Sequence, residues 1–257
     1  MILAVTEELR QKPRDAELYY RRGELYRRHG LLDLAWADLE ASQRYGSNRV
    51  MLDLSRGLLL SEAKWPVSAK TYLDRFLASE PKHVPGHAAR ARVFLQLTNQ
   101  EAAVKDLTSA ILYSEDPQPE LYVERAQVQG EAGPSGLRDA LRGLEEGLKR
   151  MGSVITLELH ALDLELRLTQ TNAALARLDK IVAQSPRKEA WCAKKGDILQ
   201  NAGRWVEARA AFAEALRHLE KLPASRRNVP ALQELATRIR TAQAEIETRL
   251  KALGRNP

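Results

Sequence analysis

Two histidines and one cysteine are the side chains whose types and spacing could form a reactive or metal-binding centre. His83 and His87 are four residues apart, which would let two imidazoles on one helix face share a metal ion. They flank residues 84–86 at the expected start of a helix, which places His83 outside the helix and favours turn and packing roles. Cys192 neighbours Trp191 on another expected helix and has no evident partner, so we predict a buried, unreactive thiol.

Catalytic sequence motifs are missing from the chain. It contains no phosphate-cradling glycine loop, no GxSxG nucleophile elbow and no HExxH zinc motif. Carboxylates are numerous, but in a chain with 29% charged residues close pairs of them arise without an acid–base role. We therefore expect no catalytic residues, no metal site and no cofactor, and we predict that the protein is not an enzyme.

Residues 17–30, ELYYRRGELYRRHG, combine arginines with tyrosines and so suggest contacts with phosphates and stacked bases. Ion pairs within a helix explain the same residues, because Glu17 precedes Arg21 and Glu24 precedes Arg28 by four positions, the favourable order. Charge also argues against a nucleic-acid surface. Residues 1–216 carry 31 Lys+Arg against 30 Asp+Glu, and residues 217–257 carry 9 against 4. Nucleic-acid binding is therefore the weaker hypothesis.

Composition indicates a soluble protein made of helices. The 257 residues are 44% hydrophobic, and alanine, leucine, glutamate and arginine dominate, as they do in helices. No apolar run approaches the ~18 residues of a membrane span, and the opening MILAV is too short for a signal peptide and lacks basic residues before it. Cytoplasm is the default compartment. Periplasm suits a single cysteine equally well, and a fragment without its signal peptide would be periplasmic or exported, so the compartment stays open.

An internal repeat runs through much of the chain. Glycine, alanine and leucine recur at a spacing of 34 residues. The recurring residues are Gly23 and Gly57, then Ala35, Ala69 and Ala103, then Leu39, Leu73 and Leu107. Each unit is predicted to hold two amphipathic helices, with a small residue that permits close helix approach and a large apolar one that fills the space beside it.

This pattern resembles the tetratricopeptide repeat, a helix–turn–helix unit of 34 residues. The resemblance implies an all-α fold, a right-handed superhelical α-solenoid of antiparallel helix pairs, with residues 1–257 as a single solenoid. The predicted repeats are 16–49, 50–83, 84–118, 119–154, 155–188 and 189–222. Two positions depart from the family pattern: Leu162 stands where the fifth repeat needs a small residue, and Trp191 falls one position early in the sixth.

The two ends are predicted to be single helices. Ile2, Val5 and Leu9 share one face, so residues 1–13 are predicted to form the second helix of an incomplete repeat. Residues 228–253 carry an apolar stripe that includes Leu235, Ile239 and Ile246 at helical spacing. A helix with one apolar stripe would cover the last exposed face of a solenoid.

In the tetratricopeptide family, partners lie along the first helices of the repeats, in a concave groove. The resemblance implies that the corresponding residues of this chain line such a groove, with an apolar strip early and acidic residues, Glu120 among them, later. The candidate groove residues are Glu17, Tyr20, Glu24, Arg27, Arg28, Met51, Leu54, Leu58, Arg92, Gln96, Val123, Gln127, Glu131, Leu159, Asp163, Arg167, Asp197 and Asn201.

The leading hypothesis is a non-enzymatic scaffold that holds a peptide or segment of a partner protein in this groove. A second hypothesis is that the chain is the helical interaction module of a larger exported or enzymatic protein, which is compatible with the first. RNA binding is a weaker third hypothesis, suggested by the basic residues after Arg217. Self-association through the N-terminal face is a further possibility.

Overall fold

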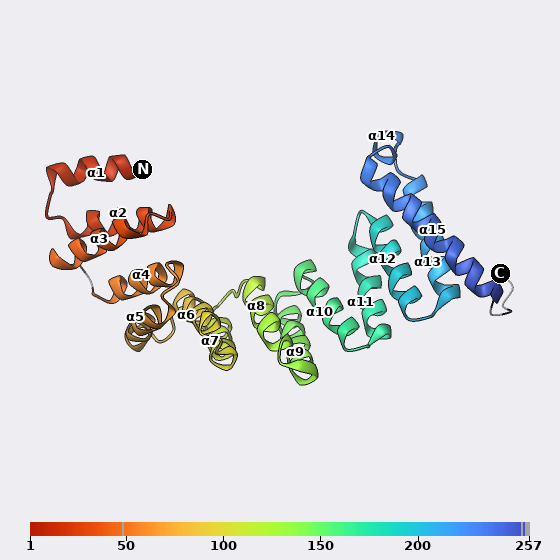
Figure 1. The fold of residues 1–257 in the computed structure, drawn as a ribbon, viewed down its shortest axis with the longest axis horizontal. Coiled ribbons are helices and arrows are strands. Elements are labelled where there is room, and N and C mark those ends of the chain that lie inside the picture. The colour runs from red at the N-terminus through yellow and green to blue at the C-terminus, as the bar shows by residue number, and fades with distance from the viewer. Residues whose placement is uncertain (48, 253, 255–257) are drawn as a thin grey trace. The chain divides into compact units, whose positions relative to one another are not determined.

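The structure is a computed structural model that describes residues 1–47, 49–252 and 254. Those residues form α-helices and no strand (Figure 1). Asn48 of the first predicted repeat and Leu253 of the predicted capping helix lie outside the described residues. The helices are α1 (Ile2–Gln11), α2 (Ala16–Arg28), α3 (Leu32–Arg44), α4 (Arg49–Glu62), α5 (Pro66–Ser79), α6 (Val84–Gln96), α7 (Gln100–Tyr113), α8 (Pro119–Gly130), α9 (Gly133–Met151), α10 (Ile155–Arg167), α11 (Thr171–Gln184), α12 (Lys188–Asn201), α13 (Trp205–Glu220), α14 (Ala224–Arg227) and α15 (Pro230–Ala252).

Local sequence determines where several helices begin and end. Asp15 caps α2, because its carboxylate accepts hydrogen bonds from the backbone N–H groups of Glu17 and Leu18 at 3.0 and 3.1 Å. Asn99 caps α7 in the same way, 3.1 Å from the N–H of Ala102. After α2 the chain turns at Gly30, whose φ of +73° suits glycine because it has no Cβ. The resulting short turns bring consecutive helices together as antiparallel pairs.

The small residues predicted from the 34-residue spacing lie where two helices of a pair touch. A Cβ added to Gly57 would come within 2.6 Å of Leu73 Cγ, and one added to Gly196 within 2.5 Å of the Phe212 ring. Real side chains cannot approach so closely, so only glycine permits these helix contacts. The predicted all-α fold of packed helix pairs is confirmed.

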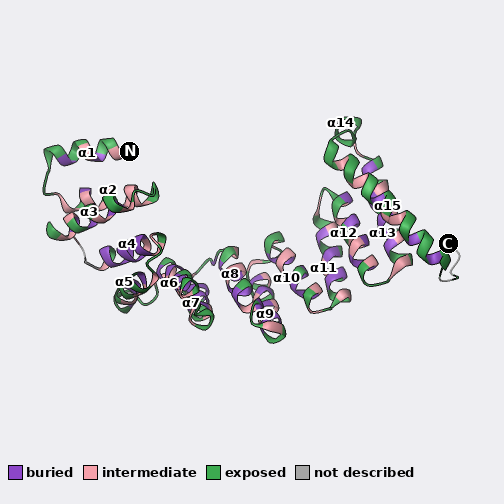
Figure 2. Ribbon diagram, viewed as in Figure 1, coloured by how far each residue is buried: buried purple, intermediate pink, exposed green. Residues whose placement is uncertain are grey.

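Compact packing divides the chain into two units. Unit 1 is Met1–Gly143 and unit 2 is Leu144–Pro257, and the boundary falls within α9 (Gly133–Met151). In unit 1 a core of leucines and alanines runs from α3 to α6, and a smaller cluster joins α1 to α2. In unit 2 a core runs from α10 through α13 to α15. Figure 2 shows buried residues along α4 and exposed residues along much of α15.

The terminal helices each bury one apolar stripe. In α1, Val5 and Leu9 pack against Leu18 of α2. In α15, Ile239, Ile246 and Leu250 are buried in the core of unit 2, where the helix contacts α12 and α13. None of the described helices has the length and apolar character that a membrane crossing requires.

Candidate binding groove

Basic residues at one repeated position tie four of the first helices to the second helix before them. The seventh residue of five predicted repeats is Arg22, Arg56, Arg90, Arg125 or Lys195. Four of these donate a hydrogen bond to the residue 16 positions earlier, on the preceding second helix. The acceptors are Thr6 (3.3 Å), Glu40 (2.8 Å), Asp74 (2.8 Å) and Asp179 (2.6 Å). We refer to this set of basic residues as the arginine series.

Members of the arginine series also contact the second helix of their own pair. Arg22 donates two hydrogen bonds to Asp38, at 2.7 and 2.8 Å, and the hydrogen bond to Asp38 raises the pKa of Arg22. Arg90 makes the same paired contact with Asp106, at 2.7 and 2.8 Å, and that contact raises the pKa of Arg90. Such paired bonds fix the orientation of the first helix and of the side chains on its other face.

The arginine series was missed from the sequence. Its members show the same 34-residue recurrence as the glycines, from Arg22 to Arg56 to Arg90, so the spacing of a charged residue type would have revealed it. Arg56 departs from the paired pattern because Tyr72 occupies the place that Asp38 and Asp106 hold. The Arg56 guanidinium instead lies 5.8 Å from the Tyr72 ring centroid.

Some side chains of the arginine- and tyrosine-rich stretch in α2 take part in packing, and others belong to the predicted groove. Tyr19 is half-buried and stacks on Tyr45 with ring centroids 5.4 Å apart. Tyr20 reaches across to α4, where its hydroxyl accepts a 3.2 Å hydrogen bond from Ser55. The ion pair predicted between Glu24 and Arg28 is wrong. Glu24 pairs instead with Arg27 at 2.9 Å.

Arg27 takes this role because it also reaches α4, where it pairs with Glu62. Burial by itself lowers the pKa of Arg27, but the hydrogen bonds and charges of Glu24 and Glu62 outweigh it and raise the pKa above its ordinary value. Arg28 and Glu17 are exposed. The stretch therefore serves helix packing and ion pairing. Tyr20 and Arg27 contact α4, and Glu24 pairs with Arg27.

The predicted apolar strip on α4 lies partly in the core. Leu54 is only 8% exposed and belongs to the core cluster of unit 1, so it offers no surface to a partner. Leu58 is half-buried against the same cluster. Met51, at 40% exposed, is the accessible apolar side chain of the three.

The structure brings three predicted groove residues together between α6 and α8. Arg92, Gln127 and Glu131 line a cleft of about 420 Å³. Two contacts join residues of its lining: a 2.6 Å ion pair between Arg92 and Glu124 and a 2.6 Å hydrogen bond from Gln100 to Glu131. The complete lining is Arg92, Leu95, Thr98, Gln100, Glu124, Gln127, Val128 and Glu131.

Two further predicted residues of unit 1 lie beside the cleft on the same helices. Gln96 of α6 donates hydrogen bonds to the hydroxyl and the carbonyl oxygen of Ser61 on α4, at 3.1 and 3.3 Å. Val123 of α8 is half-buried, and Glu120, one turn earlier on α8, is exposed. Side chains of α4, α6 and α8 are thus linked along the predicted face.

In unit 2 some of the predicted residues are exposed and others are engaged with the core or with another helix. Asp197 of α12 pairs with Arg238 of α15 at 2.7 Å, so the C-terminal helix already occupies it. Leu159 is half-buried against the core, and Asp163 lies 4.0 Å from Arg167. Asn201 is exposed at the end of α12. No described pocket of unit 2 gathers several of these residues, as the cleft between α6 and α8 does in unit 1.

The two histidines singled out from the sequence have structural partners. His83 lies before α6, and its Nδ1 accepts a 3.0 Å hydrogen bond from the N–H of Gly86. The ring nitrogens of His87 each lie 2.9 Å from an oxygen, one of Asp106 and one the carbonyl of Pro81. Both ring nitrogens of His87 and Nδ1 of His83 are therefore engaged in packing and capping.

Buried charges elsewhere serve the packing of unit 2. Arg177 of α11 bonds Glu165 at 2.7 and 2.9 Å and Glu158 at 2.6 Å. Burial by itself lowers the pKa of Arg177, but these hydrogen bonds outweigh it and raise the pKa above its ordinary value. The Cys192 thiol is buried, and burial followed by the charge of Glu214 raises its pKa. A nucleophilic cysteine needs the opposite shift.

Comparison with known proteins identifies the fold. No protein-family model matches the sequence, and no curated protein matches it. A tetratricopeptide repeat protein from Parabacteroides merdae is similar in structure, at 17% identity and a TM-score of 0.54, covering 93% of this chain and 90% of that one. The C-terminal part of a TPR repeat-containing protein from Cytophaga hutchinsonii is similar at 13% identity and a TM-score of 0.57, covering 96% and 89%.

A third similar structure is that of YrrB, a TPR protein with an unusual peptide-binding site. It is 17% identical, with a TM-score of 0.54, and the match covers 72% of this chain and 94% of that one. At these identities the likeness concerns the fold alone. The helix pairs, their small contact residues and the three similar structures agree, and the chain has the tetratricopeptide-repeat fold.

Proposed function

We propose that the protein is a non-enzymatic scaffold that binds an extended peptide segment of a partner protein in the cleft between α6 and α8. The cleft supports this proposal because it gathers Arg92, Gln127 and Glu131, which the resemblance to the tetratricopeptide repeat implied as groove residues. One wall of the cleft is α6, which Arg90 joins to α5 and α7.

The chemistry of the cleft defines the ligand. Leu95, which is 37% exposed, provides apolar surface, whereas Arg92 and Gln127 offer N–H donors suited to peptide carbonyl groups. The carboxylates of Glu124 and Glu131 face a cation or a peptide N–H. We therefore expect a segment with an apolar side chain flanked by polar residues, of which at least one is basic. A chain that forms part of a larger protein would use the same cleft.

The test is selection of peptides from a displayed random library on the immobilised protein. We expect the enriched peptides to lose about tenfold or more in affinity, about 1.4 kcal/mol, with Arg92→Glu, which reverses a charge beside Glu124. Gln127→Ala should weaken the same peptides by removing a donor. Affinity is measured by fluorescence anisotropy of the labelled peptides.

Arg138→Glu supplies a matched control, because it reverses an exposed arginine of unit 1 outside the cleft. Circular dichroism of each variant verifies that the helices are intact. Peptides that bind all three variants equally would show that the binding surface lies elsewhere. Leu54 is unsuitable for this experiment since it is a core residue.

A further inference from the structure

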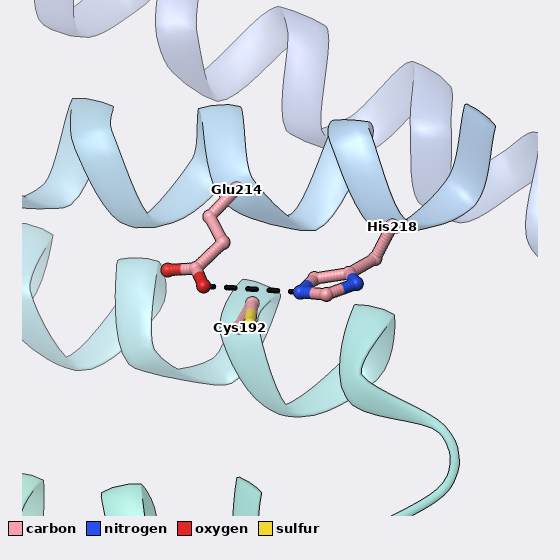
Figure 3. Close-up of side chains that lie close together, drawn as sticks. All are labelled: Cys192, Glu214 and His218. Carbon is pink, nitrogen blue, oxygen red and sulfur yellow. Dashed lines mark ion pairs between the residues drawn. The ribbon is translucent and has the colours of Figure 1, made fainter. Parts of the chain in front are cut away.

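Three side chains able to bind a metal ion converge between α12 and α13. Cys192 lies on α12, and Glu214 and His218 lie on α13, four residues apart and therefore on one helix face. One donor atom of each, the thiol sulfur, a carboxylate oxygen and an imidazole nitrogen, lies within 4.8 Å of the other two. Figure 3 shows Glu214 and His218 pointing toward each other above the cysteine, with 3.8 Å between Nε2 of His218 and Oε1 of Glu214.

The three positions differ in burial in a way that suits an ion held at the edge of the core. Cys192 is 2% exposed, so packing fixes the position of its sulfur. Glu214 is exposed and His218 is half-buried, so solvent reaches the other side of the cluster. An ion could enter from that side, and water would fill any coordination position that the protein leaves open.

Donor types and charge select the ion. Thiolate, imidazole and carboxylate are together the ligands that proteins use for Zn²⁺. A thiolate and a carboxylate carry two negative charges and neutral imidazole none, so one divalent cation makes the set neutral. Neutrality matters here because an uncompensated charge beside the core is costly. We propose that Cys192, Glu214 and His218 bind one Zn²⁺, with water as the fourth ligand.

The distances are close to those that zinc requires. Bonds of about 2.0–2.3 Å in a tetrahedral arrangement place neighbouring donor atoms about 3.3–3.8 Å apart. The separation of His218 and Glu214 already falls near this range. Bringing all three atoms from within 4.8 Å into it needs about 1 Å of movement, which rotation of the accessible Glu214 and His218 side chains supplies.

Burial and the charge of Glu214 raise the pKa of the Cys192 thiol, so Zn²⁺ binding must release the thiol proton. Lys195, three residues after Cys192 on α12, is paired with Asp179 at 2.6 Å. No other described group of three His, Cys, Asp or Glu side chains meets the same distance condition. Binding would join α12 to α13 and so add to the stability of unit 2.

The experiment uses the full chain without an affinity tag, so that no added histidines bind metal. Zn²⁺ is titrated in competition with a chromophoric chelator, and we expect one equivalent to bind. Loss of an outer-shell partner of a metal site weakens metal binding about 10–100-fold. Cys192→Ser and His218→Ala each remove a ligand, so each should weaken Zn²⁺ binding by more than that. His160→Ala, which removes a histidine of the same unit outside the cluster, should leave the affinity unchanged.

Co²⁺ provides a second measurement because a thiolate ligand gives it a sulfur-to-metal charge-transfer absorption band. We expect this band in the wild type and its loss in Cys192→Ser. His218→Ala guards against misfolding as an explanation, since that side chain is accessible. Zn²⁺ binding that is equal in the wild type and both variants, or a Co²⁺ complex without the sulfur band, would overturn the proposal.

Discussion

A histidine that caps a helix stabilises it only while its ring nitrogen can accept a hydrogen bond. His83 does this for α6 through Gly86, and burial, opposed by the charge of Glu80, lowers the pKa of His83. The folded-state pKa therefore lies below the unfolded value of about 6.5. The capping contribution is fully present above that value and is lost as the pH falls through the folded-state pKa.

We predict that α6 loses about 0.5–2 kcal/mol of local stability on acidification, the usual contribution of a helix cap. His83→Asn should remove this loss, because an asparagine side chain caps at any pH in this range. Hydrogen exchange of α6 peptides, converted to free energies over a series of pH values, measures the difference. Parallel pH dependence in the two proteins would contradict the prediction and assign the acid sensitivity to other groups.

At the scale of an element, the contact between α12 and α13 depends on the absence of one carbon atom. Gly196 faces the ring of Phe212, and a Cβ would lie 2.5 Å from it. Gly196→Ala adds a residue of better helix propensity, but the two helices must separate to admit it. We predict a net destabilisation of about 1–3 kcal/mol, the cost of overpacking.

Chemical denaturation followed by circular dichroism measures this loss. Lys194→Ala, an exposed position on the same helix, introduces alanine without a steric conflict and should be neutral or slightly stabilising. Equal stability of the Gly196→Ala and Lys194→Ala variants would show that the helix pair adjusts without cost. The result bears directly on how strictly the repeat spacing of small residues controls packing.

At the scale of the whole molecule, helices contact their near neighbours in sequence, so a local defect should stay local. Ile246 of α15 is fully buried in the core of unit 2. Ile246→Ala should cost about 2–5 kcal/mol and accelerate hydrogen exchange in α13 and α15. Glu247→Ala, at the exposed neighbouring position, is the control. Equal acceleration in α2 to α7 would instead show that the chain opens as one cooperative unit.

The sequence predicted the fold well because its spacing is simple. Gly57 and Ala69 mark helix contacts by residue type alone, and the structure places them there. Single groove residues were harder to predict, because a repeat position states which helix face a residue occupies but not how deeply it lies. Leu54 is in the core for this reason. The division of the chain into repeats and the binding role of the groove residues stay predictions.

Contacts between helices that follow no sequence motif could not be predicted from the sequence. Cys192 precedes Glu214 by 22 residues and His218 by 26, a separation that matches no metal-binding pattern. The expectation of no metal site rested instead on the placement of His83 and His87 at a helix start and on the lack of an evident partner for Cys192. Only the packing of α12 against α13 brings Cys192, Glu214 and His218 together.

The arginine series also constrains the number of residues that separate neighbouring helices. Four of its five members reach a residue 16 positions earlier, so a one-residue insertion within a helix, between the basic residue and its acceptor, would turn the basic residue about 100° around its helix axis and away from its acceptor. Duplication or loss of a complete 34-residue segment, by contrast, would return every arginine to an equivalent partner. The hydrogen bonds of the arginine series are therefore kept when complete repeats are gained or lost, and they are broken when a chain gains or loses part of a repeat.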